Sequence, residues 1–253
     1  MSRRGERRDA AGPSDSLEPM LHSQSADVLR AAAADPRLSE DLALALLTRR
    51  DLTDRVLDAL SKNVSAMKSR KVLNALVRHP RTPRHLSLPI ARRLYTFELM
   101  QLALTPGIAV DLKMAAEEAI INRLESISSG ERLALSRRAS GRVAAALLLD
   151  PEARIISAAL DNPQMTEALI VPALMRDEIP TALIKSVAAH TKWSLRREIR
   201  IALLRNPNTP LATAITVAQA LPSSVLREVL RTSRLAENIR VYLLQQLESR
   251  KKN

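Results

Sequence analysis

Apolar residues recur along this chain at intervals of three and four residues, the spacing that places side chains on one face of an α-helix. Charged neighbours such as Lys71 and Arg200 lie toward other faces. A short amphipathic helix cannot bury its apolar face alone, so the pattern predicts helices stacked in units around a continuous core. Two such faces consist of Val72, Ala75 and Leu76, and of Ile199, Ala202 and Leu203.

Both apolar faces run into the same turn phrase. Residues 76–83 read LVRHPRTP and residues 203–210 read LLRNPNTP, which are identical at five of eight positions. Proline disfavours helical geometry in the residue that precedes it. The first helix is therefore expected to stop near His79, and the second near Asn206.

The second half of the phrase predicts that a new helix begins at once. The hydroxyls of Thr82 and Thr209 can cap that helix by accepting its first backbone N–H groups. Pro83 and Pro210 then occupy the first helical position, where the N–H that proline lacks would have had no partner. The phrase is interpreted as a helix stop followed by a helix start.

Weaker copies of the phrase set a period. Its prolines are Pro36, Pro80, Pro163 and Pro207, separated by 44, 83 and 44 residues. The middle interval is nearly twice the others, so a degenerate copy is expected near Leu124. Just beyond that point, Ser128 or Ser129 is a suitable helix cap, with Glu131 in the first turn.

This spacing predicts five units of roughly 43 residues, each with three short helices. Pro89 and Pro172 fall at the same depth in equivalent first helices and predict a shared kink or break. We therefore expect an all-α fold, a right-handed α-solenoid over residues 26–253, after a disordered polar tail over residues 1–25. The expected unit starts are Ser39, Thr82, Ser128, Thr166 and Thr209.

Composition supports the helical interpretation. Of 253 residues, 46% are hydrophobic but only 2% are aromatic, so Leu, Ala, Ile and Val must fill the core. The absence of cysteine excludes disulfides and thiolate metal sites and is compatible with a reducing, cytoplasmic setting. No stretch is expected to serve as a signal peptide or a membrane span.

The period and the turns resemble known helical repeats. Two or three helices in 40 to 47 residues are typical of armadillo and HEAT solenoids. The turn phrase, and residues 147–166 with their D-P and N-P turns, are similar to the leucine-rich repeat variant, a bacterial helical repeat. Members of that family can carry an iron-sulfur cluster on a Cys-rich segment. This chain has no cysteine, so the resemblance implies no cofactor here.

Residues for catalysis are sparse. Histidines are scattered without the spacing that places two metal ligands on one helix face, and no phosphate-binding loop or nucleophile motif occurs. HEAT-like DNA glycosylases use this architecture with aromatic side chains and an acid. Trp193 among basic residues, with Glu198 nearby, matches that pattern only in part. We therefore predict no catalytic or metal site, and we interpret Trp193 as a packing residue at a helix start.

Charge provides the strongest local signal. The chain carries 39 basic and 27 acidic residues, a net charge of +12. Residues 59–97, the acid-free segment, contain nine basic residues and no acidic one. Phosphates or an acidic protein would bind such a surface through charge-assisted contacts. The alternative is a solvated face whose acidic partners come from neighbouring helices. The candidate binding residues are Lys68, Arg70, Lys71, Arg78, Arg81, Arg84, Arg92 and Arg93.

The absence of a catalytic set favours a binding role. We expect a non-enzymatic helical-repeat scaffold that engages a protein partner through its third helices and the acid-free segment. The first alternative is a solenoid that binds the phosphate backbone of a nucleic acid. The second is a HEAT-like DNA glycosylase.

Overall fold

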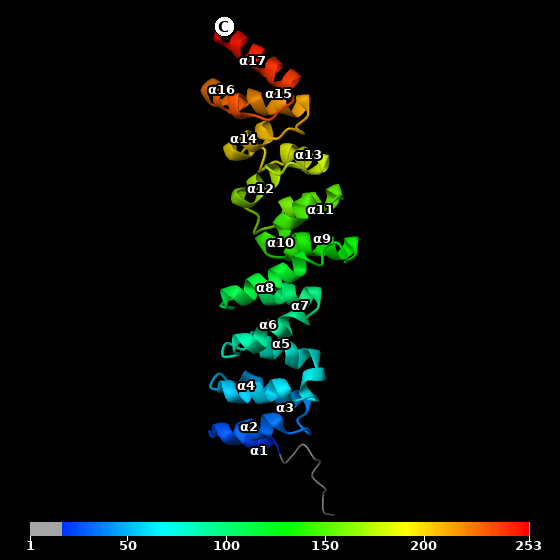
Figure 1. Ribbon diagram of the computed structural model, residues 1–253, viewed down its shortest axis with the longest axis vertical. Coiled ribbons are helices and arrows are strands. Elements are labelled where there is room, and N and C mark those ends of the chain that lie inside the picture. The colour runs from blue at the N-terminus through cyan, green and yellow to red at the C-terminus, as the bar shows by residue number, and fades with distance from the viewer. Residues whose placement is uncertain (1–16, 253) are drawn as a thin grey trace, which may run out of the picture. The chain divides into compact units, whose positions relative to one another are not determined.

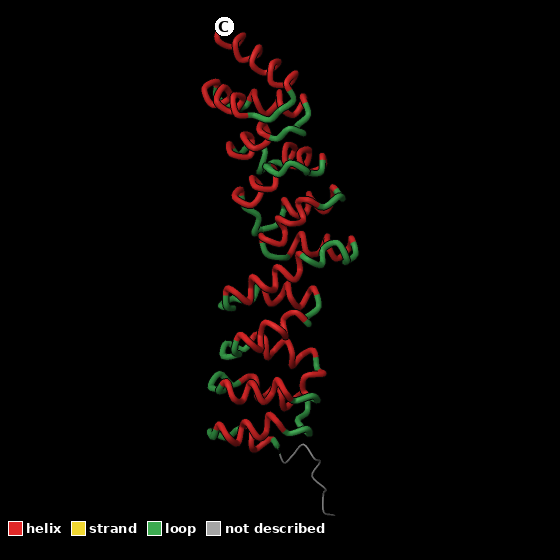
Figure 2. Tube along the Cα trace, in the orientation of Figure 1, coloured by secondary structure: helices red, strands yellow, loops and turns green. Residues whose placement is uncertain are grey.

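The computed structural model describes residues 17–252 of the chain. This part is all-helical: it forms 17 α-helices and two short 3-10 helices, and none of its residues lies in a strand (Figure 2). The fold class predicted from the sequence is confirmed at that level. The chain divides into two compact units, the first ending at Ala119 and the second beginning at Ile120. A single repeat domain over residues 26–253 stays a prediction.

The first unit consists of helices of four to 12 residues joined by short turns (Figure 1). Its elements are α1 (Glu18–Leu21), α2 (Ala26–Ala34), α3 (Glu40–Thr48), α4 (Asp54–Lys62), the 3-10 helix η1 (Ala66–Lys68), α5 (Arg70–Arg78), α6 (Arg84–Arg92), α7 (Thr96–Ala103) and α8 (Val110–Ile121), whose last two residues belong to the second unit.

The second unit is likewise built of short helices joined by turns. Its elements are α9 (Ser129–Arg138), α10 (Gly141–Ala146), the 3-10 helix η2 (Leu147–Leu149), α11 (Ala153–Leu160), α12 (Glu167–Leu174), α13 (Thr181–Ala189), α14 (Arg197–Arg205), α15 (Leu211–Gln219), α16 (Ser223–Thr232) and α17 (Glu237–Lys252). No helix in residues 17–252 combines the length and apolarity needed to cross a membrane.

Helices within each unit pack on the helix two positions along the chain. In the first unit α2 contacts α4 and α3 contacts α5; in the second, α9, α11, α13, α15 and α17 form one such series and α10, α12, α14 and α16 the other. Leucine and alanine fill the space between them: Leu46, Leu57, Leu76, Leu174 and Leu203 are fully buried. Aliphatic side chains thus supply the core, as the composition predicts.

Buried polar side chains join these stacked helices at their ends. Asn63, which follows α4, donates from Nδ2 to the backbone oxygens of Ala33 and Asp35 at 2.9 Å each. Asn206, which follows α14, donates to the oxygen of Leu174 at 2.6 Å. We call such a contact, from the turn after one helix to the end of the helix two before it, a turn bridge. The residues that form them are Asn63, His79, Asn162, His190, Asn206 and Ser233. His190 differs from the others because it is half-buried and contacts the carboxylate of Asp161 instead of a backbone oxygen.

Each turn-bridge residue also accepts a hydrogen bond from the backbone two residues further on. Nδ1 of His79 accepts from the N–H of Arg81 at 3.3 Å, so its Nε2 carries the proton and donates to the oxygen of Arg49 at 2.7 Å. Asn, neutral His and Ser share this chemistry because each side chain carries both a donor and an acceptor. The last four carbonyls of a helix lack partners inside it, and the bridges satisfy some of them.

The two copies of the turn phrase stop their helices where the sequence predicts. Helix α5 is followed by His79 and α14 by Asn206 as C-caps. The predicted role of the threonines is wrong. Thr82 and Thr209 donate back to the oxygens of Leu76 and Leu203, at 2.6 Å each, and so close the preceding helix. The same carbonyls also accept the backbone N–H groups of His79 and Asn206, so each threonine adds a second donor to a helix end. The next helix begins without a side-chain cap after Pro83 or Pro210.

Other predicted helix starts are confirmed. Ser39 caps α3 by accepting from the N–H of Leu42, and Ser128 forms a reciprocal capping box with Glu131 at the start of α9. Pro89 and Pro172 lie inside α6 and α12. Neither proline breaks its helix, but α6 ends three residues later and α12 two residues later.

The expected N-terminal tail needs one correction. Residues 1–16 lie outside the described residues, but helix α1 falls within the stretch 1–25 that the sequence assigns to a disordered tail. Leu17 and Leu21 are 1% and 4% exposed, and α1 contacts α2 and α3. Two leucines four residues apart lie on one helix face, so the apolar contact orders this segment.

The turn bridges generate a first prediction. Replacing Asn206 by Ala leaves the buried oxygen of Leu174 without its donor, so the free energy of unfolding should fall by about 2 kcal/mol. Urea denaturation followed by far-UV circular dichroism measures the change. Asn208→Ala is the matched control, since Asn208 lies on the same turn and its side chain makes only a solvent-exposed hydrogen bond, to the oxygen of Asp177 at 3.2 Å, so it should change stability by less than about 0.5 kcal/mol. Equal losses in the two variants would contradict the bridge.

Candidate functional site

One face of α5 carries a row of polar side chains. Arg70, Asn74 and Arg78 follow one another at four-residue spacing, which places them on successive turns of the same face. They oppose Glu98 and Gln101 of α7. Together with Lys71 and Ala75, these residues line a cleft of about 430 Å³. We call it the α5–α7 cleft.

Arg70 is held at one end of the cleft by three groups. Its guanidinium forms an ion pair with Glu98 and donates from Nη1 to the oxygen of Arg93 at 3.0 Å. Its central carbon lies 3.7 Å from the centroid of the Tyr95 ring, a cation–π contact. Tyr95 is nevertheless 67% exposed. An aromatic ring therefore faces solvent with a fixed guanidinium beneath it.

Glu98 is the acidic centre of the cleft. Besides Arg70, it accepts from the backbone N–H of Tyr95 at 2.6 Å and from Nδ2 of Asn74 at 2.8 Å. Burial by itself would raise the pKa of Glu98, but these three hydrogen bonds to the carboxylate outweigh it, so the pKa lies below its ordinary value. Glu98 is thus ionised at neutral pH.

Lys71 is paired on the other side of α5. Its Nζ donates to Glu40 of α3 at 2.8 Å, and the hydroxyl of Ser69 donates to the same carboxylate at 2.6 Å. The hydrogen bond from Lys71 is the larger cause of the lowered pKa of Glu40, and in return it raises the pKa of Lys71. The Lys71 side chain is 74% exposed, so solvent screens this pair.

Some buried polar atoms of the α5–α7 cleft lack a hydrogen-bond partner within the described part of the chain. Three buried side-chain atoms there have no hydrogen-bond partner: Nε of Arg70, Oδ1 of Asn74 and Nε of Arg78. Buried polar groups in proteins are almost always paired, and an unpaired one is unfavourable by about 1–3 kcal/mol. Three on one helix face mark the α5–α7 cleft as a place where a partner can supply the missing hydrogen bonds once the side chains shift.

The other predicted binding residues are distributed around these helices. Arg84 forms an ion pair with Asp111 of α8, and Arg81 donates to the backbone oxygens of Asp51 and Leu52 at 3.4 and 3.3 Å. Acidic partners from neighbouring helices therefore exist for Arg70, Lys71 and Arg84. Only Arg70, Lys71 and Arg78 line the α5–α7 cleft. Lys68, Arg92 and Arg93 are exposed and do not line it.

Several residues of the cleft were not found from the sequence. Glu98 and Gln101 lie beyond the acid-free segment, and Asn74 is uncharged. The one feature of the sequence that points to this cleft is the four-residue spacing from Arg70 to Asn74 to Arg78, which places the three side chains on one helix face. The acidic side chain came from a different helix, so the charge pattern of residues 59–97 alone could not show it.

Trp193 is a packing residue, as predicted, but it lies in the turn before α14 and not at the start of that helix. Its side chain is 2% exposed, and Nε1 donates to the oxygen of Leu160 at 2.9 Å. Lys192 covers the ring with its Nζ 4.0 Å from the centroid. The indole is therefore part of the turn bridge around His190, which accepts from the N–H groups of Lys192 and Trp193. A buried ring in this position cannot stack on a nucleobase.

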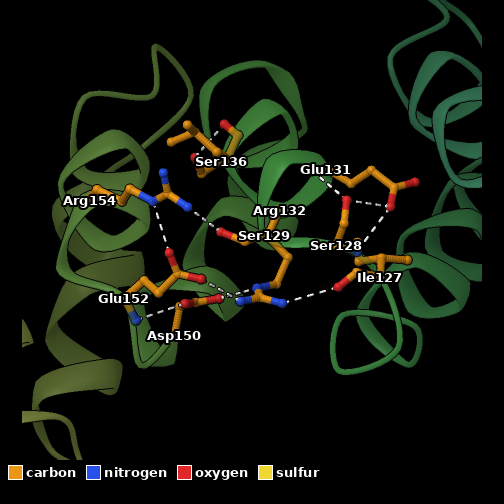
Figure 3. A network of polar contacts seen from close by, with 10 residues as sticks. Ile127, Ser128, Ser129, Glu131, Arg132, Ser136, Asp150, Glu152 and Arg154 are labelled. Carbon is orange, nitrogen blue, oxygen red and sulfur yellow. Dashed lines mark hydrogen bonds and ion pairs between the residues drawn. The ribbon is translucent and has the colours of Figure 1, made fainter.

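A second polar network lies in the other unit, between α9 and the start of α11 (Figure 3). Arg132 donates from Nε to Asp150 at 2.7 Å, from Nη2 to Glu152 at 2.9 Å and from Nη1 to the oxygen of Ile127 at 3.1 Å. Arg154 extends the network by binding Glu152 and Ser129. Every nitrogen of Arg132 is engaged and the Asp150 side chain is 4% exposed, so the network is a structural clamp.

Comparisons with known proteins found no match to the chain among protein-family models, curated proteins or solved structures. Within residues 17–252, no three of the side chains that commonly bind metals gather in one place. The interpretation of the site thus depends on its own geometry.

Glu98 generates a prediction about acid stability. Because its pKa is lowered on folding, its carboxylate stabilises the fold above its ordinary pKa of 4.5, and this contribution is lost as the pH falls through the folded value. Glu98→Gln should lower the free energy of unfolding by about 1–2 kcal/mol at pH 7, and the difference should shrink toward pH 3. Urea titrations at several pH values measure it. Asp41→Asn, an exposed carboxylate on α3, is the control; a difference that does not depend on pH would be contrary to expectation.

Arg132 generates a prediction about the second unit. Arg132→Met leaves the buried Asp150 carboxylate without its cation, so the free energy of unfolding should fall by about 3 kcal/mol. Arg154→Met removes an arginine that is 62% exposed in the same network and should lower it by less than about 1 kcal/mol. Thermal and urea denaturation measure both; similar losses would argue against the clamp.

Proposed function

We propose that this protein is a non-enzymatic α-solenoid of about five three-helix repeats that binds an acidic segment of a protein partner in the α5–α7 cleft. The repeat arrangement is supported by the packing of helices on the helix two before them, seen for α2 to α5 in the first unit and for α9 to α17 in the second, and by the turn bridges that recur with it. The observation that carries the binding proposal is the row of unpaired buried polar atoms on α5.

The charge of the cleft supports an acidic partner. The lining of the cleft contains three basic residues, Arg70, Lys71 and Arg78, and one acidic residue, Glu98. It therefore carries an excess of positive charge. The free atoms are two N–H donors and one amide oxygen. A peptide segment offers carboxylates and carbonyls for the donors and backbone N–H groups for the acceptor. It therefore matches both the charge and the hydrogen-bonding inventory.

The exposed aromatic residues add a second kind of contact. Tyr95 is 67% exposed and Phe97 is 38% exposed, both at the start of α7 beside the cleft. Aromatic side chains and arginines are enriched among the residues that dominate protein interfaces. An acidic segment bound along α5 would reach this aromatic pair at its Arg70 end.

Nucleic acid is the competing partner. What favours protein is that Glu98, Glu40 and Asp111 already hold the guanidinium or ammonium groups of three predicted phosphate-binding residues. A protein that binds the phosphate backbone of a nucleic acid gains affinity from Lys and Arg side chains that neutralise phosphates. Carboxylates placed among those side chains repel the phosphates. Peptide carboxylates are repelled too, but the polar atoms of the cleft are suited to peptide groups.

A direct binding measurement tests the proposal. A fluorescent deca-glutamate peptide should bind the protein in an anisotropy titration, and Arg78→Gln should weaken it about tenfold through loss of a charge-assisted contact. The matched control is Arg55→Gln, an exposed arginine of α4 that lines a different cleft. A single-stranded oligonucleotide of equal charge should bind more weakly. Tighter oligonucleotide binding, lost equally in both variants, would favour the nucleic-acid function instead.

A further inference from the structure

A second cleft continues from the first. It has a volume of about 400 Å³ and lies between the turn after α5 and the loop before α8, with His79, Pro80 and Thr82 on one side and Thr105 to Ala109 on the other. Arg78 lines both clefts. A ligand that runs along α5 from Arg70 toward its C-terminal end therefore arrives at this second cleft.

Three arginines from three separate elements line it. Arg50 comes from the turn between α3 and α4, Arg78 from the end of α5 and Arg84 from the start of α6. None of the described residues that line the cleft is acidic. Asp111 binds Arg84 from outside the lining, and both side chains are about half exposed. We call it the arginine cleft.

The arginines keep donors available for a ligand. Arg50 is exposed, and no ion pair holds it among the contacts of the described residues. Arg78 uses one terminal nitrogen to contact Gln101 at 3.1 Å, while its Nε is buried without a partner. Among the described residues, Arg84 forms an ion pair with Asp111 and with no other carboxylate. Guanidinium groups that line the same cleft suit an anion with several oxygens.

The number of arginines selects the kind of anion. A carboxylate brings one charge and two oxygens, which one arginine can satisfy in a bidentate pair. A phosphoryl group on a side chain brings nearly two charges and three strong acceptor oxygens. Three guanidinium groups around one cleft match the phosphoryl group in both charge and donor number.

We propose that the acidic segment carries a phosphorylated residue whose phosphoryl group enters the arginine cleft. This inference rests on the proposed function, because it uses the same segment and the same Arg78. From Arg70 to Arg78 the helix rises by about 12 Å, which an extended peptide covers in about four residues. The phosphorylated residue should therefore lie about four positions from the acidic residue that contacts Arg70.

Three synthetic peptides test the inference. Each has four glutamates on both sides of a central residue, so that either chain direction fits, and the centre is serine, phosphoserine or two glutamates. Fluorescence anisotropy measures their affinity for the wild-type protein, for Arg50→Gln and for the control Arg55→Gln. Arg50 is exposed and does not line the α5–α7 cleft, so its replacement leaves that cleft intact.

The phosphoserine peptide should bind the wild-type protein about tenfold more tightly than the serine peptide, and more tightly than the peptide with two added glutamates. Arg50→Gln should abolish most of that gain without changing the affinity for the serine peptide, and Arg55→Gln should change neither. A gain that persists in Arg50→Gln, or that two glutamates reproduce, would overturn the phosphoryl site.

Failure of the inference differs from failure of the proposed function. If the serine peptide binds and phosphorylation adds nothing, the α5–α7 cleft stands and the phosphoryl site is wrong. If no peptide binds, the partner is wrong, and titration of inorganic phosphate observed by ³¹P NMR decides about the arginine cleft by itself. Arg50-dependent broadening of the phosphate signal would retain a phosphoryl site there, and its absence would exclude one.

Discussion

The structure depends on satisfying the carbonyl groups at buried helix ends. Short helices expose a large share of their backbone polar groups at their termini, and stacking them removes water from those groups. The turn bridges solve this problem with a single buried residue per turn, which donates to the helix two before it and accepts from its own turn. The same contact therefore fixes both the local turn and the spacing between stacked helices.

The local part of this fold could be predicted from sequence. Proline sets the helix stops at His79 and Asn206 because its effect on the preceding residue requires no tertiary information. The direction in which Thr82 and Thr209 donate could not be predicted, because a hydroxyl near two helix termini can serve either one. The turn itself brings the carbonyls of Leu76 and Leu203, six residues before each threonine, within reach, and that decides the outcome.

The candidate site shows the same division. The four-residue spacing of Arg70, Asn74 and Arg78 is visible in the sequence, but their partners are not. Glu98 lies 28 residues from Arg70, and Glu40 lies 31 residues from Lys71. A segment without acids thus becomes a surface with mixed charge once helices two apart are stacked. What distinguishes the cleft is the hydrogen-bonding capacity left over after that pairing.

The turn bridges connect residues only 23 to 32 positions apart. Each bridged pair of helices can therefore close its bridge soon after its second helix forms, without waiting for a distant part of the chain. Chains dominated by such short-range contacts fold rapidly and pay little loop-closure entropy. The bridge also makes the helix pair a transferable module, since each bridge joins a turn only to the helix two before it.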